Sequence, residues 1–406
     1  MSISPISISE RIVSIDVLRG VAVLGILIMN IQSFSMPNAA YINPDAYGDL
    51  TGINKWVWIL SHILASEKFM SIFSLLFGAG VLIFTEKAFS KGKNSAALHY
   101  KRMGWLLMFG MLHAYLLWYG DILVTYSLCG MFVFLFRNKQ ATSLVWAGLG
   151  FFMVPIVLNT LFGVSTSYWP EESYHSTMQS WVPGAEIIQN QIQIMRGGWL
   201  KQMEMRIPSS IFMQSGYFLM EPFWQVTSMM LMGMALYKWK ILSAERSKGF
   251  YTRMAIIGLA AGYALSGLGV ILDFRNGWSM EFSMFIGKQF NYIGSVGVAL
   301  GYVAIIMLTC KSTKFRNYKI LGASVGRMAF SNYILQTIIC TFIFYGHGLA
   351  LYGRVERKIQ LLIVFGIWFI VILISSLWLK RFRFGPLEWF WRILTYWKWQ
   401  PILINP

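Results

Sequence analysis

The stretch LHAYLLWYGDIL, residues 112–123, places His113 deep in an apolar helix that ends on the turn Gly120-Asp121. Ionisable side chains at membrane depth are costly to bury, and they usually face a bundle interior or a water-filled cavity. We therefore expect the function of this protein to centre on His113.

The composition around this stretch is that of a membrane protein. Of the 406 residues, 56% are hydrophobic and only 13% are charged, and several apolar runs are long enough to cross a bilayer. A soluble enzyme with a single core is excluded by so much apolar sequence. The net charge of +17 is explained by membrane orientation and by contact with anionic lipid headgroups, so we predict membrane lipids and no nucleic acid as partners.

The apolar runs predict an all-α bundle of about ten crossings. They lie at 14–35, 66–85, 103–119, 121–136, 141–163, 208–236, 254–273, 284–309, 327–350 and 358–379. With the N-terminus assigned to the cytoplasm, more than two thirds of the 34 lysines and arginines fall on the inner side. This asymmetry predicts that both termini are cytoplasmic.

Two segments lie outside the crossings of this 1–379 bundle. Residues 164–205 are too polar to cross, and they are expected to form either a cap over the outer face or a flexible loop. Residues 380–406 mix four tryptophans with arginine and lysine, which predicts a cytoplasmic, interfacial amphipathic tail with a helix opened by Pro386.

The polar residues of the crossings fall at two depths. Asn30 and His113 each follow a basic residue at the cytoplasmic helix start by 11 residues, or roughly 16 Å at about 1.5 Å per residue. The same reasoning puts Gln336 near the middle of the bilayer. The outer layer holds Lys68, Asp121 and Glu221.

Each of these residues also has a purely structural interpretation. Asp121 can cap the next helix, and Lys68 can extend to the outer interface. Asn30 and Gln336 can hydrogen-bond neighbouring helices, and Glu221 can bind backbone groups freed by Pro222. His113 can be a neutral structural histidine.

The functional interpretation makes His113 a general base. A histidine held by a carboxylate can remove a proton from a hydroxyl or an amine, and an amide can stabilise a developing oxyanion. Asp121 is then the candidate orienter and Asn30 the candidate oxyanion donor. On a straight helix His113 and Asp121 would be roughly 12 Å apart. Direct contact therefore requires a bend at Gly120, and Glu221 is the alternative orienter.

Other chemistry has little support in the sequence. Cys129, Cys310 and Cys340 lie in apolar segments without zinc-ligand spacing, so no metal is predicted. There is no GxGxxG after a strand, no P-loop, no GxSxG and no HExxH. No cleavage pattern for a signal peptide follows the first apolar run.

Five stretches resemble the YeiB family of bacterial multi-pass membrane proteins, which implies a location in the plasma membrane. These stretches are Ser14–Gly20, Phe73–Gly80, the His113–Leu123 stretch, Gly326–Tyr333, which includes Asn332, and Phe382–Trp389.

Residues 16–30 are also similar to the first helix of integral membrane acyltransferases, including the enzyme that acetylates heparan sulfate glucosamine. Arg19 and Asn30 match its arginine and asparagine spacing, whereas Tyr41 occupies the place of its catalytic histidine. His113 would then supply the base.

We therefore predict an integral membrane acyltransferase. It would move an acyl group from acetyl-CoA or another acyl-CoA to a small-molecule, glycan or lipid acceptor reached from the outer face. The predicted catalytic residues are His113, Asn30, Asp121 and Glu221, and the predicted pocket residues are Lys68, Gln336, Tyr41, Asn332 and Arg19. A transporter or channel and a non-enzymatic membrane protein remain the alternatives, and a homodimer is compatible with the sequence.

Overall fold

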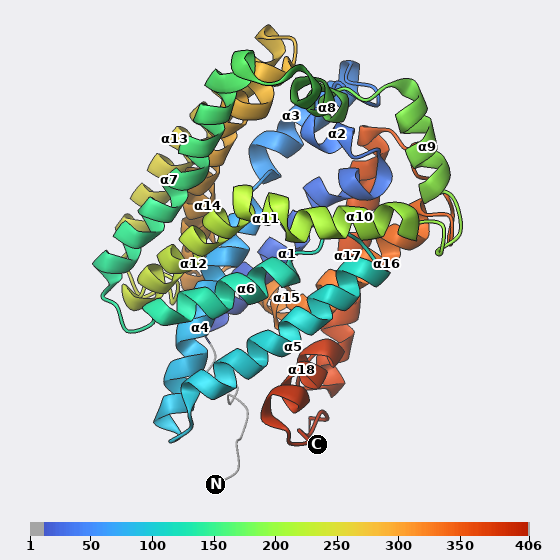
Figure 1. The fold of residues 1–406 in the computed structure, drawn as a ribbon. Coiled ribbons are helices and arrows are strands. Elements are labelled where there is room, and N and C mark those ends of the chain that lie inside the picture. The colour runs from blue at the N-terminus through green and yellow to red at the C-terminus, as the bar shows by residue number, and fades with distance from the viewer. Residues whose placement is uncertain (1–11, 405–406) are drawn as a thin grey trace.

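The computed structural model describes residues 12–404, and these residues form a bundle of helices (Figure 1). The first half of the chain gives α1 (Val13–Ser35), α2 (Ala39–Ile42), α3 (Gly52–Ala65), α4 (Lys68–Ser90), α5 (Ser95–Leu116), α6 (Leu123–Val133), α7 (Ala141–Ser165), α8 (Glu171–Trp181) and α9 (Ala185–Met195). The second half gives α10 (Met203–Gln214), α11 (Gly216–Met220), α12 (Pro222–Lys238), α13 (Lys248–Arg275), α14 (Lys288–Lys311), α15 (Arg316–Arg327), α16 (Ala329–Phe344), α17 (Arg357–Arg381) and α18 (Pro386–Tyr396). Short 3-10 segments η2 (Phe134–Phe136) and η3 (Thr166–Tyr168) and a π-helical segment η4 (Met280–Gly287) complete them.

The helical membrane class is confirmed. Within residues 12–404, six helical segments are long and apolar enough to span a bilayer, and two shorter apolar segments accompany them. The six segments are 13–35, 52–90, 141–168, 248–275, 280–311 and 357–381, and the two shorter ones are 123–136 and 329–344. Most of the predicted crossings therefore coincide with an apolar helix.

Helix α1 is the centre of the bundle. Of its apolar window, 67% is buried inside the protein, compared with 22% for the windows that contain α7 and α17, so α1 is internal and those two helices lie at the outside of the bundle. Small residues allow α15 to approach α1 closely. A Cβ on Gly20 would overlap the carbonyl oxygen of Gly322, and one on Gly326 would overlap that of Asp16.

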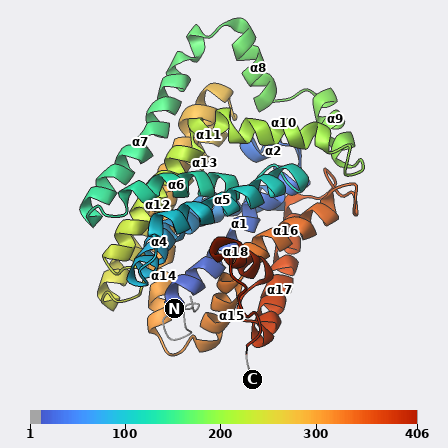
Figure 2. The same ribbon diagram turned by 60° about the horizontal axis from the view of Figure 1, so that its bottom comes forward.

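The predicted crossing over 208–236 is interrupted. Helix α11 ends at Met220, the backbone of Glu221 leaves the helical region, and α12 begins at Pro222. Proline has no N–H to donate, so it is well tolerated at the first position of a new helix and cannot continue the old one. The apolar run is therefore divided among α10, α11 and α12, which turn as they cross the molecule (Figure 2).

Residues 164–205, predicted as a long outer loop, contain α8 and α9 and are docked on the bundle. The indole of Trp181 donates to the carbonyl of Trp278 at 2.8 Å, and Arg196 Nε donates to the carbonyl of Tyr352 at 2.8 Å. Ile192 and Met195 of α9 are buried among core residues. These contacts favour the cap over the flexible loop.

The C-terminal tail forms α18, which starts at Pro386 as predicted. This helix packs against α5 and α16, and the indole of Trp391 donates to the carbonyl of Arg102 at 2.9 Å. After it, Trp397 and Trp399 are 71% and 73% exposed. The tail is therefore both a surface element and part of the bundle.

Candidate functional site

The structure brings His113 and Asp121 into direct contact. His113 Nδ1 lies 2.8 Å from Asp121 Oδ1, and His113 Nε2 lies 3.0 Å from the hydroxyl of Thr337 on α16. His113 and Thr337 are 2% and 1% exposed. Both ring nitrogens are thus engaged in a buried line of three polar side chains.

A bend between α5 and α6 makes this contact. Helix α5 ends at Leu116, where the N–H groups of Leu117 and Trp118 both donate to the His113 carbonyl. The indole ring of Trp118 covers Gly120 so closely that a Cβ there would overlap it. The chain turns back at Gly120. This is the bend without which His113 and Asp121 could not be in contact.

Asp121 has two functions in this geometry. While Oδ1 contacts His113, Oδ2 accepts the N–H of Val124 at 2.7 Å in the first turn of α6. The contact to Val124 is the one that the capping interpretation predicts, and the contact to His113 is the one that the orienting interpretation requires. An ionised Asp121 favours the proton on Nδ1, which leaves Nε2 of a neutral His113 as the acceptor for the Thr337 hydroxyl.

A cavity of about 370 Å³ adjoins this line at Tyr333, which lines the cavity and contacts the ring of His113. It extends from the exposed lysines Lys91 and Lys93, in the turn between α4 and α5, to Ile122, Leu123 and Tyr333. Among residues 12–404, the wall contains seven lysines and arginines and two carboxylates, and its interior is mostly apolar and aromatic. This combination suits an anionic ligand with an apolar part.

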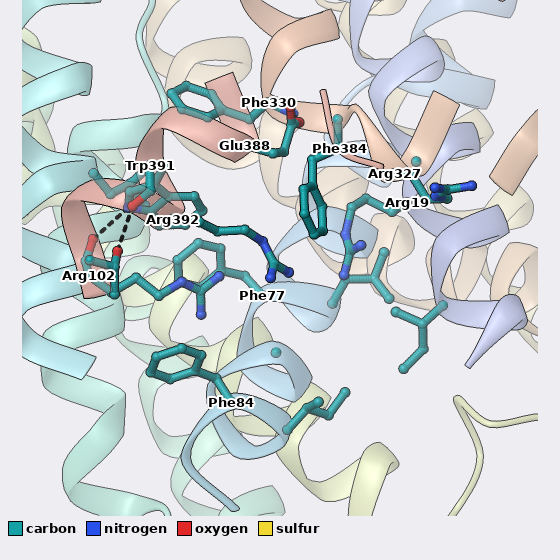
Figure 3. A pocket seen from close by; sticks show the side chains of 18 of the residues that line it. Arg19, Phe77, Phe84, Arg102, Arg327, Phe330, Phe384, Glu388, Trp391 and Arg392 are labelled. Carbon is teal, nitrogen blue, oxygen red and sulfur yellow. Dashed lines mark hydrogen bonds between the residues drawn. The ribbon is translucent and has the colours of Figure 1, made fainter. Parts of the chain in front are cut away.

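Three guanidinium groups define the cationic part of the cavity. Arg19, Arg102 and Arg392 come from α1, α5 and α18 and project toward the same space (Figure 3). Arg102 lies over the rings of Phe84 and Trp391, 4.8 and 4.5 Å from their centroids. Aromatic faces hold a guanidinium in place without neutralising it.

Tyr333 separates the cavity from His113. Its ring lines the cavity and lies 5.1 Å from the imidazole, while its hydroxyl accepts the N–H of Ile122 at 3.3 Å. His113 itself is not part of the cavity wall. In this conformation, therefore, one aromatic side chain stands between the ligand space and the histidine.

Asn30 lies on the face of α1 that continues the cavity wall. Val23 and Ile26 line the cavity, Asn30 follows Ile26 by one turn, and Ser33 after it bonds the hydroxyl of Tyr119 at 3.0 Å. Asn30 is half-buried, and its side chain makes no hydrogen bond within residues 12–404. Its side-chain amide is therefore free to donate a hydrogen bond to a ligand.

The amides on α16 hold helices together. Gln336 Nε2 donates to the carbonyl of Val23 at 3.3 Å, and Asn332 Nδ2 donates to Val325 and to Ser375 Oγ. Both side chains are buried. The interhelical interpretation thus describes Gln336 and Asn332.

Lys68 and Glu221 belong to a different polar cluster. Lys68 is fully buried and donates to Asn291 and to the carbonyl of His62, so it does not extend to the interface. Glu221 pairs with Lys288 at 2.8 Å. The residue that contacts His113 is Asp121, and Glu221 is committed elsewhere. Tyr41, in the short α2, is 43% exposed.

Sequence reasoning missed Thr337, Glu388 and Trp118. A hydroxyl in an apolar helix normally bonds its own helix backbone, so Thr337 gives no local signal. Glu388 lies in a recognised motif, but its partners Phe330 and Ser331 are distant in sequence. Such pairings are decided by how the helices pack.

Comparison with known proteins identifies the family. Residues 236–398 match the family described as Protein of unknown function (DUF418). The chain is 34% identical over 428 residues to the uncharacterized protein YxaH of Bacillus subtilis (strain 168), covering 99% of this chain and 98% of that protein. It is 31% identical over 391 residues to the uncharacterized protein YeiB of Escherichia coli (strain K12), covering 95% and 96%. The chain belongs to the YeiB family. No solved structure matches it.

The stretches that resemble the YeiB family meet at the cavity. Each of the five contributes to its wall, through Asp16 and Arg19, Phe73 to Gly80, Ile122 and Leu123, Gly326 to Tyr333, and Phe384 and Glu388. They come from both ends and the middle of the chain. The cavity and the adjoining His113 line are therefore the candidate active site of this family member.

Proposed function

We propose that the protein is an integral membrane acyltransferase of the bacterial plasma membrane. It takes the acyl group from a cytoplasmic acyl-CoA, with acetyl-CoA as the simplest donor, and transfers it to a hydroxyl or amine of an acceptor reached from the outer face. The observation that supports this most is the cavity with a cationic mouth and an apolar interior that ends beside a His–Asp pair.

The cavity matches the chemistry of such a donor. The like charges of Arg19, Arg102 and Arg392 repel one another across a partly apolar space, and Arg19 also pairs with Asp16 at 3.0 Å. Phosphate groups of the donor would relieve this repulsion through charge-assisted hydrogen bonds. The apolar interior would take the uncharged arm and the thioester.

His113 supplies the base in this proposal. Asp121 holds the ring, and Nε2 removes a proton from the attacking hydroxyl or amine. The uncommitted amide of Asn30 is the donor proposed for the negative charge that develops on the carbonyl oxygen. Gln336 and Asn332 keep α16 in register with α1 and α17.

The charge distribution supports the proposed orientation. We propose about ten crossings, with the two ends of the chain and the cavity mouth in the cytoplasm, because the loops around Lys91 and Lys314 are rich in basic residues. The docked α8–α9 segment would then cover the outer face.

Donor binding tests the proposal directly. Purified full-length protein in detergent is incubated with radiolabelled acetyl-CoA, and binding and transfer of the label are both measured. Arg102→Gln should weaken binding by about 10- to 100-fold, the worth of one lost charge-assisted contact. His113→Ala should retain binding and lose transfer.

The matched control is Arg354→Gln, the same change at an exposed site away from the cavity. It should leave donor binding unchanged. Absence of donor binding to the unaltered protein would reject the acyltransferase. Uptake of a solute into proteoliposomes without transfer of label would instead assign a transporter, whose features would include the broken α11–α12 segment at Glu221.

A further inference from the structure

We propose that Thr337 is the first acceptor of the acyl group, so that transfer proceeds through an acyl-threonine ester. This inference rests on the proposed acyltransferase function and adds a covalent step to it. It concerns a residue that no sequence motif singles out.

The geometry is that of a nucleophile, a base and an orienting carboxylate. Thr337 Oγ1 lies 3.0 Å from His113 Nε2, and His113 Nδ1 lies 2.8 Å from Asp121 Oδ1. Asp121 is fixed in turn by the N–H of Val124 at 2.7 Å. A weak nucleophile is activated when it lies within hydrogen-bond reach of a base that a third group orients.

The hydroxyl has a second partner, but a more distant one. Thr337 Oγ1 lies 3.3 Å from the carbonyl of Tyr333 in its own helix, a common bond for threonine in membrane helices. The shorter contact is the one to His113. A threonine whose hydroxyl bonded only the backbone of its own helix would not need a buried imidazole as a second partner.

An unused donor lies beside this line. The indole N–H of Trp118 is buried and has no hydrogen-bond partner among the described residues. Its ring stacks on Phe34 and stands nearly perpendicular to His113, with centroids 6.3 Å apart. Buried polar groups usually have a hydrogen-bond partner, and an oxyanion on the reacting carbonyl would provide one for this N–H.

Tyr333 controls access to Thr337. It precedes Thr337 by one helical turn, about 6 Å along the axis, and it lines the cavity. Its hydroxyl is held by one long hydrogen bond from Ile122, at 3.3 Å. Rotation of this ring would connect the cavity to the hydroxyl of Thr337.

The chemistry balances with a thioester as the sole co-reactant. Thr337 Oγ1 bonds to the carbonyl carbon while His113 Nε2 takes the hydroxyl proton. The carbon–sulfur bond then breaks, and His113 returns the proton to the departing thiolate, which leaves as free CoA. In the second half, the acceptor hydroxyl or amine attacks the ester, His113 takes its proton, and Thr337 regains it.

The test is to trap the ester. Full-length protein is mixed with radiolabelled acetyl-CoA without acceptor, quenched in acid and denatured. We expect about one label per protein chain, a matching burst of free CoA, and an acetyl group on the peptide that contains Thr337 by mass spectrometry. The bond should resist acid and be released by alkali, as an ester requires.

Variants separate the covalent step from folding. Thr337→Ser should retain the label and Thr337→Val should lose it. Thr341→Val, the same change one turn later at a buried threonine that bonds its own helix, should retain it. Circular dichroism and donor binding of Thr337→Val report whether that variant is folded.

The outcomes distinguish the two proposals. Bound donor that is turned over without any label on the protein, or a label that persists in Thr337→Val, overturns the acyl-threonine and leaves the acyltransferase intact. A protein that binds no donor loses both.

Discussion

Asp121 has a role at the residue scale that its neighbours cannot share. Its two oxygens contact His113 and the N–H of Val124. Asparagine at this position has the same shape as aspartate but only one acceptor oxygen. It can therefore accept from His113 Nδ1–H or from the Val124 N–H, but not from both with separate oxygens. In hydrolases with this arrangement, such a change costs up to about 10⁴-fold in turnover.

We therefore predict that Asp121→Asn binds labelled acetyl-CoA normally and transfers the acetyl group about 10³- to 10⁴-fold more slowly. Transfer is measured by release of free CoA, and folding by the melting temperature in detergent. If the melting temperature falls and the rate does not, Asp121 is only the cap of α6.

The sequence could place His113 and Asp121 but not their third partner. Their contact requires a bend at Gly120, and a bend there is predictable because Gly and Asp favour turns. Thr337 lies 224 residues from His113, so its contact depends on the packing of α16 against α5 and α6. No local pattern encodes that distance.

At the scale of elements, Glu388 joins α18 to α16. Its carboxylate accepts the N–H groups of Phe330 and Ser331 at 2.8 and 3.1 Å, in the first turn of α16. A carboxylate at a helix N-terminus satisfies free donors and interacts favourably with the helix dipole. Glu388 therefore fixes one wall of the cavity as well as a helix end.

We predict that Glu388→Ala lowers stability by about 1–2 kcal/mol, the typical cost of a lost cap, and weakens donor binding. Glu388→Gln should keep most of the stability, because its amide oxygen can still accept one N–H. Thermal unfolding in detergent measures both. Equal melting temperatures for Glu388→Ala and the unaltered protein would contradict this role.

The same residue predicts a pH dependence. Burial raises the pKa of Glu388 above its ordinary value of 4.5, although the hydrogen bonds from Ser331 and Phe330 oppose the shift. The folded state thus favours the neutral acid of Glu388. Its contribution to the free energy of unfolding is complete below pH 4.5 and is lost as the pH rises through the folded-state pKa. The melting temperature of the unaltered protein relative to Glu388→Gln should fall as the pH rises from 4.5 through the folded-state pKa of Glu388. A difference that rises with pH would contradict the assigned direction.

Elements were predictable where one local signal was sufficient. Apolar length located α1, α7 and α17 within a few residues, and Pro386 located the start of α18. Elsewhere the signal was incomplete. Apolar length alone predicted one crossing over 208–236, although Pro222 begins a new helix within it. Polarity alone predicted a loop over 164–205, whereas the amphipathic α9 forms there and is stabilised by the burial of Ile192 and Met195.

At the scale of the whole molecule, the position of the cavity mouth and the distribution of basic residues must indicate the same side of the membrane. The proposed function takes acyl-CoA from the cytoplasm, so it requires the mouth near Lys91 and Lys93 to face that side. Residue 12 and α18 line the same cavity, so the beginning and the end of the described chain should share the same side of the membrane. The opposite orientation would separate the cationic mouth from its proposed ligand.

Single-cysteine labelling decides the orientation. With Cys129, Cys310 and Cys340 replaced by alanine, Thr313→Cys, in the exposed turn between α14 and α15, should react with a membrane-impermeant maleimide only after cells are permeabilised. Ser173→Cys, at an exposed position of α8, should react in intact cells. The reason is the excess of basic residues around Lys314, which retains that turn in the cytoplasm. The reverse pattern would place the cavity mouth outside and exclude a cytoplasmic donor, and equal labelling of both sites in intact cells would place them on one face.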